Sequence, residues 1–120
     1  MFKRKVPQIY NYTCCISEMR IDATINISMI DACHIIPFAE SYNDSVTNGI
    51  ALCSNLHRAF DRGLIGIDDN YKVIVKSSWN EVMMSYSIKQ FEGKPISLPL
   101  KNKEFPSGEN FKSHRIRFNF

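Results

Sequence analysis

The chain has 120 residues, of which 44% are hydrophobic and 22% are charged, and its formal net charge is +3. These values, together with the absence of repeats and low-complexity tracts, indicate one globular domain and exclude a fibrous chain. The mild positive charge permits a polyanionic partner without requiring one.

The N-terminal segment, residues 1–13, is basic and aromatic, and we expect it to form a short helix or an arm. Its basic residues precede Val6-Pro7-Gln8 rather than an apolar stretch, so we expect no secretory signal. No apolar run reaches the length that spans a membrane. A reducing, cytoplasmic environment is therefore the expected location.

The four cysteines are not arranged in CxxC pairs, and most of them lie in apolar runs: Cys14, Cys15, Cys33 and Cys53. We expect free thiols that pack as small hydrophobic side chains. A four-cysteine zinc site is the alternative, but the spacing does not match the usual zinc ribbons or knuckles.

Two strands are predicted in the first third of the chain. Residues 14–19 indicate a strand that leads into a turn, and alternating apolar residues within 24–36 indicate a second strand. Pro37 ends that strand, because proline cannot donate to a β-ladder. Residues 40–49 are rich in Ser, Asn and Asp and are expected to form a polar loop.

A short apolar run at residues 50–53 is followed by a predicted helix over about 56–61. Ser54 or Asn55 fits the N-cap of this helix. Gly63 stands just beyond its end, where a residue with positive φ commonly terminates a helix.

The C-terminal part is predicted to form a hairpin and a last helix. The hairpin covers residues 64–75 around a polar turn, and Ser107 is expected to cap the helix with Asn110 at the capping-box position. We therefore predict an α+β fold in one domain over residues 1–120. Its core of two strands and a helix covers about 12–65, and an extension covers about 66–120.

Two histidines stand in contexts suited to hydrolysis of a phosphodiester. A nearly neutral imidazole at His34, next to apolar Cys33, could accept a proton from water. His57 and Asp61 are four residues apart, so on a helix they would share one face and could bind a divalent ion. From these residues alone, a core histidine and a solvated His–Asp pair remain open alternatives.

Asn48 offers a different chemistry, because its carboxamide can both donate to and accept from the backbone. It could therefore clamp the loop that positions His34. The alternative is an ordinary Asn-Gly turn formed with Gly49.

In combination, these segments resemble the HNH endonuclease family, in particular the HNH domains of restriction-type endonucleases. The resemblance covers roughly residues 10–118 and is carried by Tyr12, Cys15-Ile16-Ser17, Ala32 to Pro37, Asn48 to Cys53, His57 to Leu64, Phe105-Pro106-Ser107 and His114-Arg115. It implies a ββα-metal finger and a metal-dependent endonuclease that cleaves DNA. Such domains often act in restriction or antiphage defence.

The resemblance also implies roles for individual residues. His34 would be the general base, Asn48 the residue that fixes the loop, and His57 a metal ligand. Asp61 stands where some members place a further ligand. One divalent ion is implied; Mg²⁺ is the expected one, with Mn²⁺, Ni²⁺ and Zn²⁺ as alternatives.

One departure from the family concerns the residue before the general base, which is often an Asp or His ligand and is Cys33 in this chain. Three explanations are open: Cys33 binds a softer ion, Asp31 substitutes for it, or His57 and Asp61 hold the ion with water and phosphate. The departure also supports an alternative function, a catalytically degenerate HNH-type module that binds nucleic acid. A protein-interaction domain with a structural metal is a further rival.

Basic residues supply candidate contacts to DNA phosphates. Arg58 and Arg62 flank the proposed metal helix, an N-terminal arm carries Lys3 and Arg4, and a C-terminal patch contains Lys112, Arg115 and Arg117. No pattern for reading bases is recognisable, so target specificity would require a recognition or sensor domain in a longer chain. RNA as the substrate and a homodimer as the active form remain open.

Overall fold

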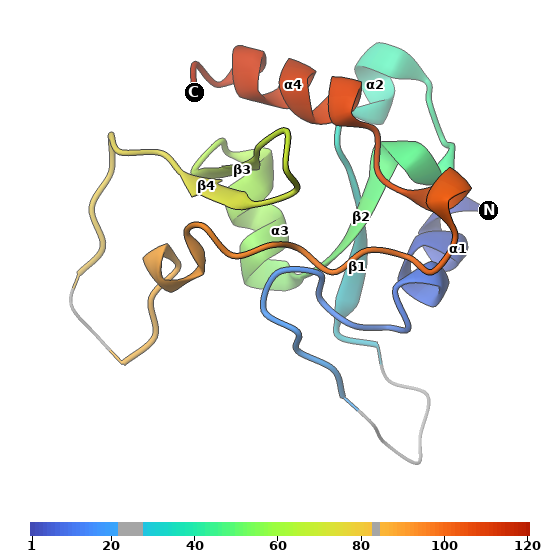
Figure 1. Cartoon of the computed structure of the whole chain (residues 1–120), viewed down its shortest axis with the longest axis horizontal. Helices are drawn as coiled ribbons and strands as arrows, with labels where there is room; N and C mark the ends of the chain where they lie inside the picture. The colour runs from blue at the N-terminus through green and yellow to red at the C-terminus, as the bar shows by residue number, and fades with distance from the viewer. Residues whose placement is uncertain (22–27, 83–84) are drawn as a thin grey trace.

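The centre of the fold is a ββα unit, in which two antiparallel strands lead into a helix (Figure 1). The computed structural model describes residues 1–21, 28–82 and 85–120. Strand β1 (Ile30–His34) pairs with β2 (Gly49–Cys53), and helix α3 (Ser54–Asp61) follows β2 directly. The predicted ββα core is thus confirmed, although residues 24–27 of the predicted second strand lie outside the described ranges.

Helix α3 begins differently from the prediction. Its N-cap is Cys53, and neither Ser54 nor Asn55 caps it. The carboxamide oxygen of Asn55 instead accepts from the Cys53 thiol and from the N–H of Leu56. That side chain is therefore engaged inside the first turn rather than ahead of it.

The apolar face of α3 and its end follow the sequence pattern. Leu56, Ala59 and Phe60 recur at helical spacing and are buried in the core. Gly63 lies just past the end of the helix with φ of +71°, as predicted. A Cβ atom at Gly63 would lie 2.3 Å from the ring of Phe118, so this position also lets the C-terminal segment approach closely.

Helix α1 (Phe2–Ile9) realises one of the two options for the N-terminal segment and packs on both strands. Phe2 and Val6 are among its buried residues. Gly49 permits this approach, because a Cβ there would lie 2.6 Å from Phe2 and 2.8 Å from Val6. The first residue of β2 is therefore constrained by a helix that lies far from it in sequence.

Two other predictions are wrong. Residues 14–19 form a turn closed by a backbone hydrogen bond between its ends, not a strand. The N–H of Cys15 donates to the carbonyl of Ala51 in β2, but this contact does not extend into a ladder. The expected polar loop over 40–49 overlaps two short helices, α2 (Phe38–Ser41) and η1 (Val46–Asn48).

The C-terminal part packs on the ββα unit as a hairpin, short helical turns and a final helix. The predicted hairpin is confirmed as β3 (Ile65–Ile67) and β4 (Val73–Val75). The Ser107 hydroxyl accepts from the N–H of Asn110, which confirms the predicted cap. The remaining elements are η2 (Lys89–Phe91), η3 (Asn102–Glu104) and α4 (Gly108–Arg117). Helix α4 lies above the hairpin, and its first turn is the end nearer α2 (Figure 1).

One hydrophobic core joins α1, both strands of the ββα unit, α3, the hairpin and α4. All four cysteines are buried with free thiols, so the prediction that they pack as small hydrophobic side chains is confirmed. Across the described ranges, no helix combines the length and apolarity that crossing a membrane would take.

Candidate active site

His34 ends strand β1, and its ring is held by an acid and an aromatic side chain. Its Nε2 atom lies 2.9 Å from Oδ1 of Asp44. The ring stacks on Phe2 with 3.9 Å between centroids and 7° between planes, and its centroid lies 5.7 Å from that of Phe38. In a neutral imidazole, donation from Nε2 to the carboxylate leaves Nδ1 as the nitrogen that can accept a proton.

Asn48 is buried at the end of the loop that follows His34. Its Oδ1 accepts from the N–H of Ile36 at 3.0 Å and from Nδ2 of Asn110 at 3.1 Å. Its Nδ2 donates to the carbonyls of Ile36 and Asn43, each at 3.0 Å. The side chain therefore ties the start of the loop to its later part and joins both to α4.

His57 lies between two carboxylates. Its Nδ1 is 2.9 Å from Oδ2 of Asp31, and its Nε2 is 3.1 Å from Oδ2 of Asp61. The hydrogen bond to Asp61, opposed by burial and helped by the bond to Asp31, raises the pKa of His57 to about 9. The i, i+4 spacing on α3 thus brings His57 and Asp61 together on one face.

Three of the four candidate ligands form one group. Donor atoms of Cys33, His57 and Asp61 all lie within 4.8 Å of one another. Asp31 is bound to Nδ1 of His57 and is not part of this group. Burial raises the pKa of the Cys33 thiol well above its ordinary value, and Sγ donates to Oδ1 of Asp61 at 3.7 Å.

Three hollows meet at His57. The first, here called the reaction pocket, has a volume of about 330 Å³ and is lined by Ala32, His34, Ile35, Pro37, Phe38, His57, Asp61, His114, Arg117 and Phe118. The second lies along α3 and the third between α1 and β1. Both histidines therefore border space that a phosphodiester chain could occupy.

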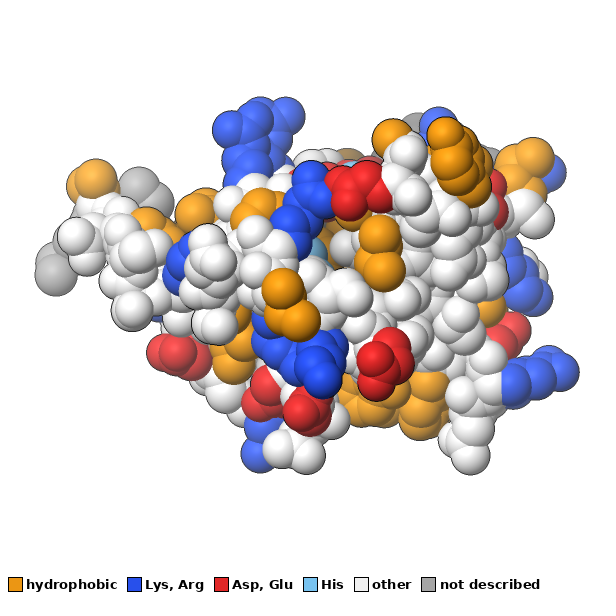
Figure 2. All heavy atoms as spheres, turned by 90° about the horizontal axis from the view of Figure 1, so that it is seen from above, with side chains coloured by type: hydrophobic (Ala, Val, Ile, Leu, Met, Phe, Trp, Pro, Cys, Tyr) orange, Lys and Arg blue, Asp and Glu red, His pale blue; other side chains and the backbone are white. Residues whose placement is uncertain are grey.

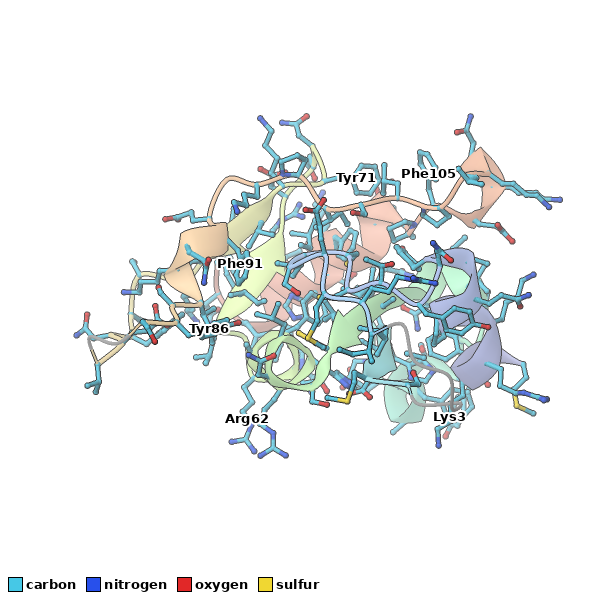
Figure 3. The ribbon with its side chains drawn as sticks, turned by 90° about the horizontal axis from the view of Figure 1, so that it is seen from below. Lys3, Arg62, Tyr71, Tyr86, Phe91 and Phe105 are labelled. Carbon is cyan, nitrogen blue, oxygen red and sulfur yellow. The ribbon has the colours of Figure 1, made fainter. Side chains whose placement is uncertain are left out.

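The basic candidates divide between these hollows and the rest of the surface. Arg58 and Arg62 line the second hollow, and Lys3 and Arg4 line the third. Figure 3 places Lys3 and Arg62 along the same edge of the molecule. The two cations can therefore flank a strand that passes the histidines.

Lys112 and Arg115 line none of the three hollows. Lys112 is exposed on α4. Arg115 donates to the carbonyl of Ile67 at 2.6 Å and to Oδ1 of Asp69 at 2.8 Å, so it fastens α4 to the β3–β4 hairpin. Arg58 and Arg62 thus lie at the site, whereas Arg115 stabilises the contact between α4 and the hairpin.

His114 is buried between α4 and α3. Its ring stacks on Phe60 with 3.7 Å between centroids, and its Nε2 donates to the carbonyl of Phe60 at 2.8 Å. Burial lowers the pKa of His114, which favours the neutral ring. This contact attaches the C-terminal helix to the helix that carries His57 and Asp61.

Sequence reasoning missed two acids at the site. Asp44 holds His34, and Glu40 of α2 pairs with Arg117 of α4. Both acids lie in the polar segment between His34 and Asn48, so the acidic content of that loop was the available signal. Their partners could not be read from spacing, because Asp44 pairs with His34 across a folded loop and Glu40 pairs with Arg117, 77 residues away.

A histidine on the first strand of a hairpin, facing a His–Asp pair on the helix that follows, defines a ββα-finger nuclease fold. Residues 14–68 match the family model described as HNH endonuclease. This match agrees with the resemblance to the HNH endonuclease family that was inferred from the sequence, which is thereby confirmed. The segment beyond Asp68, which includes α4, lies outside this match.

Similar proteins include one solved structure described as the modification-dependent TagI restriction endonuclease. It is 18% identical, with a TM-score of 0.75 over 99% of this chain and 38% of that one, so the likeness extends the shared fold to α4. This chain thus spans about two fifths of the length of that structure. Among curated proteins, none matches the sequence.

Proposed function

We propose that this chain is a metal-dependent endonuclease that hydrolyses phosphodiester bonds in DNA, in restriction or antiphage defence. The observation that carries the proposal is the reaction pocket, which His34 shares with His57 and Asp61. The proposed general base and the proposed metal ligands therefore line the same pocket. The fold likeness to a restriction endonuclease supports the assigned process.

The residues present fit a single divalent ion. His57 and Asp61 offer an imidazole nitrogen and a carboxylate oxygen 3.1 Å apart on one helix face. The Cys33 thiol is buried and stays protonated, so it suits a hard ion such as Mg²⁺ poorly and would ligate a softer ion only after losing its proton. We therefore propose His57 and Asp61 as the protein ligands of Mg²⁺, with Mn²⁺, Ni²⁺ or Zn²⁺ as alternatives.

Asp31 would act through His57 rather than on the ion. By accepting from Nδ1, its carboxylate directs Nε2 toward Asp61. An outer carboxylate of this kind fixes the tautomer and the orientation of a ligand histidine. When bound, the divalent ion supplies positive charge to the phosphate and to the departing oxygen.

His34 would remove the proton from the attacking water through Nδ1, since Asp44 accepts from Nε2. The water oxygen forms the new bond to phosphorus, the bond to the leaving sugar oxygen breaks, and that oxygen takes a proton from solvent water. Asn48 holds the loop after His34, so the base keeps its position relative to the helix. Arg58 and Arg62 would bind neighbouring phosphates, and Lys112 and Arg115 are the more remote candidates.

We further propose that residues 1–120 act as one nuclease domain, with a core at about 12–65 and an extension at about 66–120. A recognition or sensor domain would choose the target, and a homodimer would cut both strands. The rival function is a degenerate HNH-type module that binds nucleic acid, and the buried thiol of Cys33 at a common ligand position favours it. RNA is the rival substrate.

The test is nicking of supercoiled plasmid by the wild type and by His34→Ala, in Mg²⁺, Mn²⁺, Ni²⁺, Zn²⁺ and EDTA. We expect metal-dependent nicking that falls by about 100-fold or more in the variant. Lys103→Ala is the matched control, because Lys103 is exposed and lines none of the three hollows. A folded wild type that binds DNA but never nicks it would establish the degenerate module instead.

A further inference from the structure

We propose that Arg117, at the end of α4, binds the scissile phosphate, and that Glu40 holds its guanidinium until the substrate arrives. This inference rests on the proposed nuclease function and adds a substrate-binding residue to it. Arg117 lies outside the segment that matches the HNH endonuclease family. Its assignment therefore comes from its place in this structure.

Arg117 borders the same pocket as the base and the candidate ligands. It is the one Lys or Arg among the described residues that line this pocket, which also holds the carboxylate of Asp61. Asp31 and Asp44 stand beside the two histidines. A phosphate that enters meets a largely acidic surround, so a cation at this wall would offset the repulsion.

The last turn of α4 is fixed in place by contacts on both sides of Arg117 in the sequence. His114 donates to the carbonyl of Phe60 in α3, and Arg115 donates to Ile67 and Asp69 of the hairpin. Arg117 is thus presented from a helix that is tied to the helix carrying His57. A guanidinium held this way loses less conformational freedom when it binds phosphate.

The partner of Arg117 in this structure is replaceable. Its Nη1 pairs with Oε2 of Glu40, and the two side chains are 46% and 52% exposed. Exposed pairs of this kind contribute little to folding stability. A phosphate offers two oxygens to the planar guanidinium, so it can take the place of one carboxylate.

The position of the pair suits an exchange of this kind. Glu40 lies on α2, two residues after Phe38, which lines the reaction pocket. Figure 2, which looks down on α2 and α4, shows basic and acidic side chains in contact beside a hollow where a histidine is visible. A phosphate approaching the histidines from this side would meet the pair first.

The test is binding of a fluorescent DNA duplex in EDTA, followed by anisotropy over a range of salt concentrations. For Arg117→Ala we expect weaker binding and a log K against log salt slope smaller by about 0.9, the value for one lost phosphate contact. Glu40→Gln should bind more tightly than the wild type. Lys103→Ala is the charge-matched control, since η3 lies near Phe105, which Figure 3 places at the edge opposite Lys3 and Arg62.

Cleavage is the second readout. We expect Arg117→Ala to lower kcat by about 100-fold, Arg117→Lys to recover part of it, and Lys103→Ala to leave it unchanged. The inference would be overturned if Arg117→Ala unfolded like the wild type and had the same salt slope and kcat as Lys103→Ala. Nicking that depends on His34 would still support the nuclease in that case. If the wild type never nicks DNA, the proposed nuclease function is wrong, and the salt dependence of DNA binding alone decides whether Arg117 contacts a phosphate. A wild type without DNA binding would overturn both.

Discussion

Nε2 of His34 lies 2.9 Å from Oδ1 of Asp44, so the proposed base is oriented by an acid ten residues further along the chain. The side chain of Asp44 is 59% exposed and that of His34 27% exposed, so the pair lies at the rim of the site. A rim contact of this kind adds little to folding stability. Its consequence is the choice of tautomer, which leaves Nδ1 free to accept a proton.

The first prediction concerns Asp44. Asp44→Ala removes the acceptor at Nε2, so both tautomers of His34 become populated and the ring loses a restraint. We expect kcat for DNA cleavage to fall about tenfold to 100-fold with KM nearly unchanged, and Asp44→Asn to recover part of the loss because its oxygen still accepts. Steady-state cleavage assays measure both constants. Glu92→Gln, an exposed acid outside the three hollows, is the control; an Asp44→Ala enzyme as fast as that control would contradict the orienting role.

The second prediction concerns Asn48, which is buried and bonded to both backbone groups of Ile36. Asn48→Ala leaves those groups without partners, so we expect a loss of about 2–3 kcal/mol in the free energy of unfolding. We also expect slower DNA cleavage under conditions in which the variant is still folded, because the loop after His34 loses its clamp. Urea unfolding measures the first quantity. Asn43→Ala is the matched control, because the half-buried side chain of Asn43 accepts, among the described residues, from Ser45 of its own turn. Equal stability of the two variants would remove Asn48 from the role of loop clamp.

Local chemistry explains which parts could be predicted from the sequence. Gly63 has a positive φ, and the Ser107 side chain accepts from the N–H three residues further on. Each feature depends on a few neighbouring residues, so the end of one helix and the start of the other could be predicted from the sequence. The spacing of His57 and Asp61 likewise fixes a shared helix face. In each case the partners are neighbours in sequence, which is where propensity and periodicity carry information.

Contacts between distant segments could not be predicted in the same way. Glu40 and Arg117 are 77 residues apart, and their pairing depends on how α4 docks on α3. The strand expected at residues 14–19 failed for a related reason, since its apolar residues are buried in a turn packed by other elements. Apolar content alone does not distinguish a buried turn from a strand.

The third prediction is a pH dependence of stability in the metal-free protein. The pKa of His57 is raised to about 9 in the folded state from an ordinary value of 6.5, so the folded state binds this proton more tightly than the unfolded chain does. The associated stability is fully present below pH 6.5 and is lost as the pH rises through about 9. Because Asp31 and Asp61 are partly exposed, we expect a modest decrease, on the order of 5 °C in Tm.

Differential scanning fluorimetry in EDTA across this range measures that decrease. His57→Gln should show a smaller change in Tm with pH, because the titrating group is gone. The control is His114→Gln; the pKa of His114 is lowered, so its proton does not add stability in this window. A Tm that is flat between pH 6.5 and 9 in the wild type would show that the two carboxylates do not hold the His57 proton.

The last prediction separates the explanations for Cys33. If His57 and Asp61 bind Mg²⁺ without the thiol, Cys33→Ala should retain Mg²⁺-dependent cleavage within about threefold while losing about 1 kcal/mol of stability to the cavity. A softer ion such as Zn²⁺ can displace the thiol proton, so Zn²⁺ affinity, measured by calorimetry, should fall in this variant. Cys15→Ala, a buried cysteine outside the ligand group, controls for the cavity. Loss of Mg²⁺-dependent cleavage in Cys33→Ala, with Cys15→Ala unaffected, would instead place the sulfur among the ligands of the working ion.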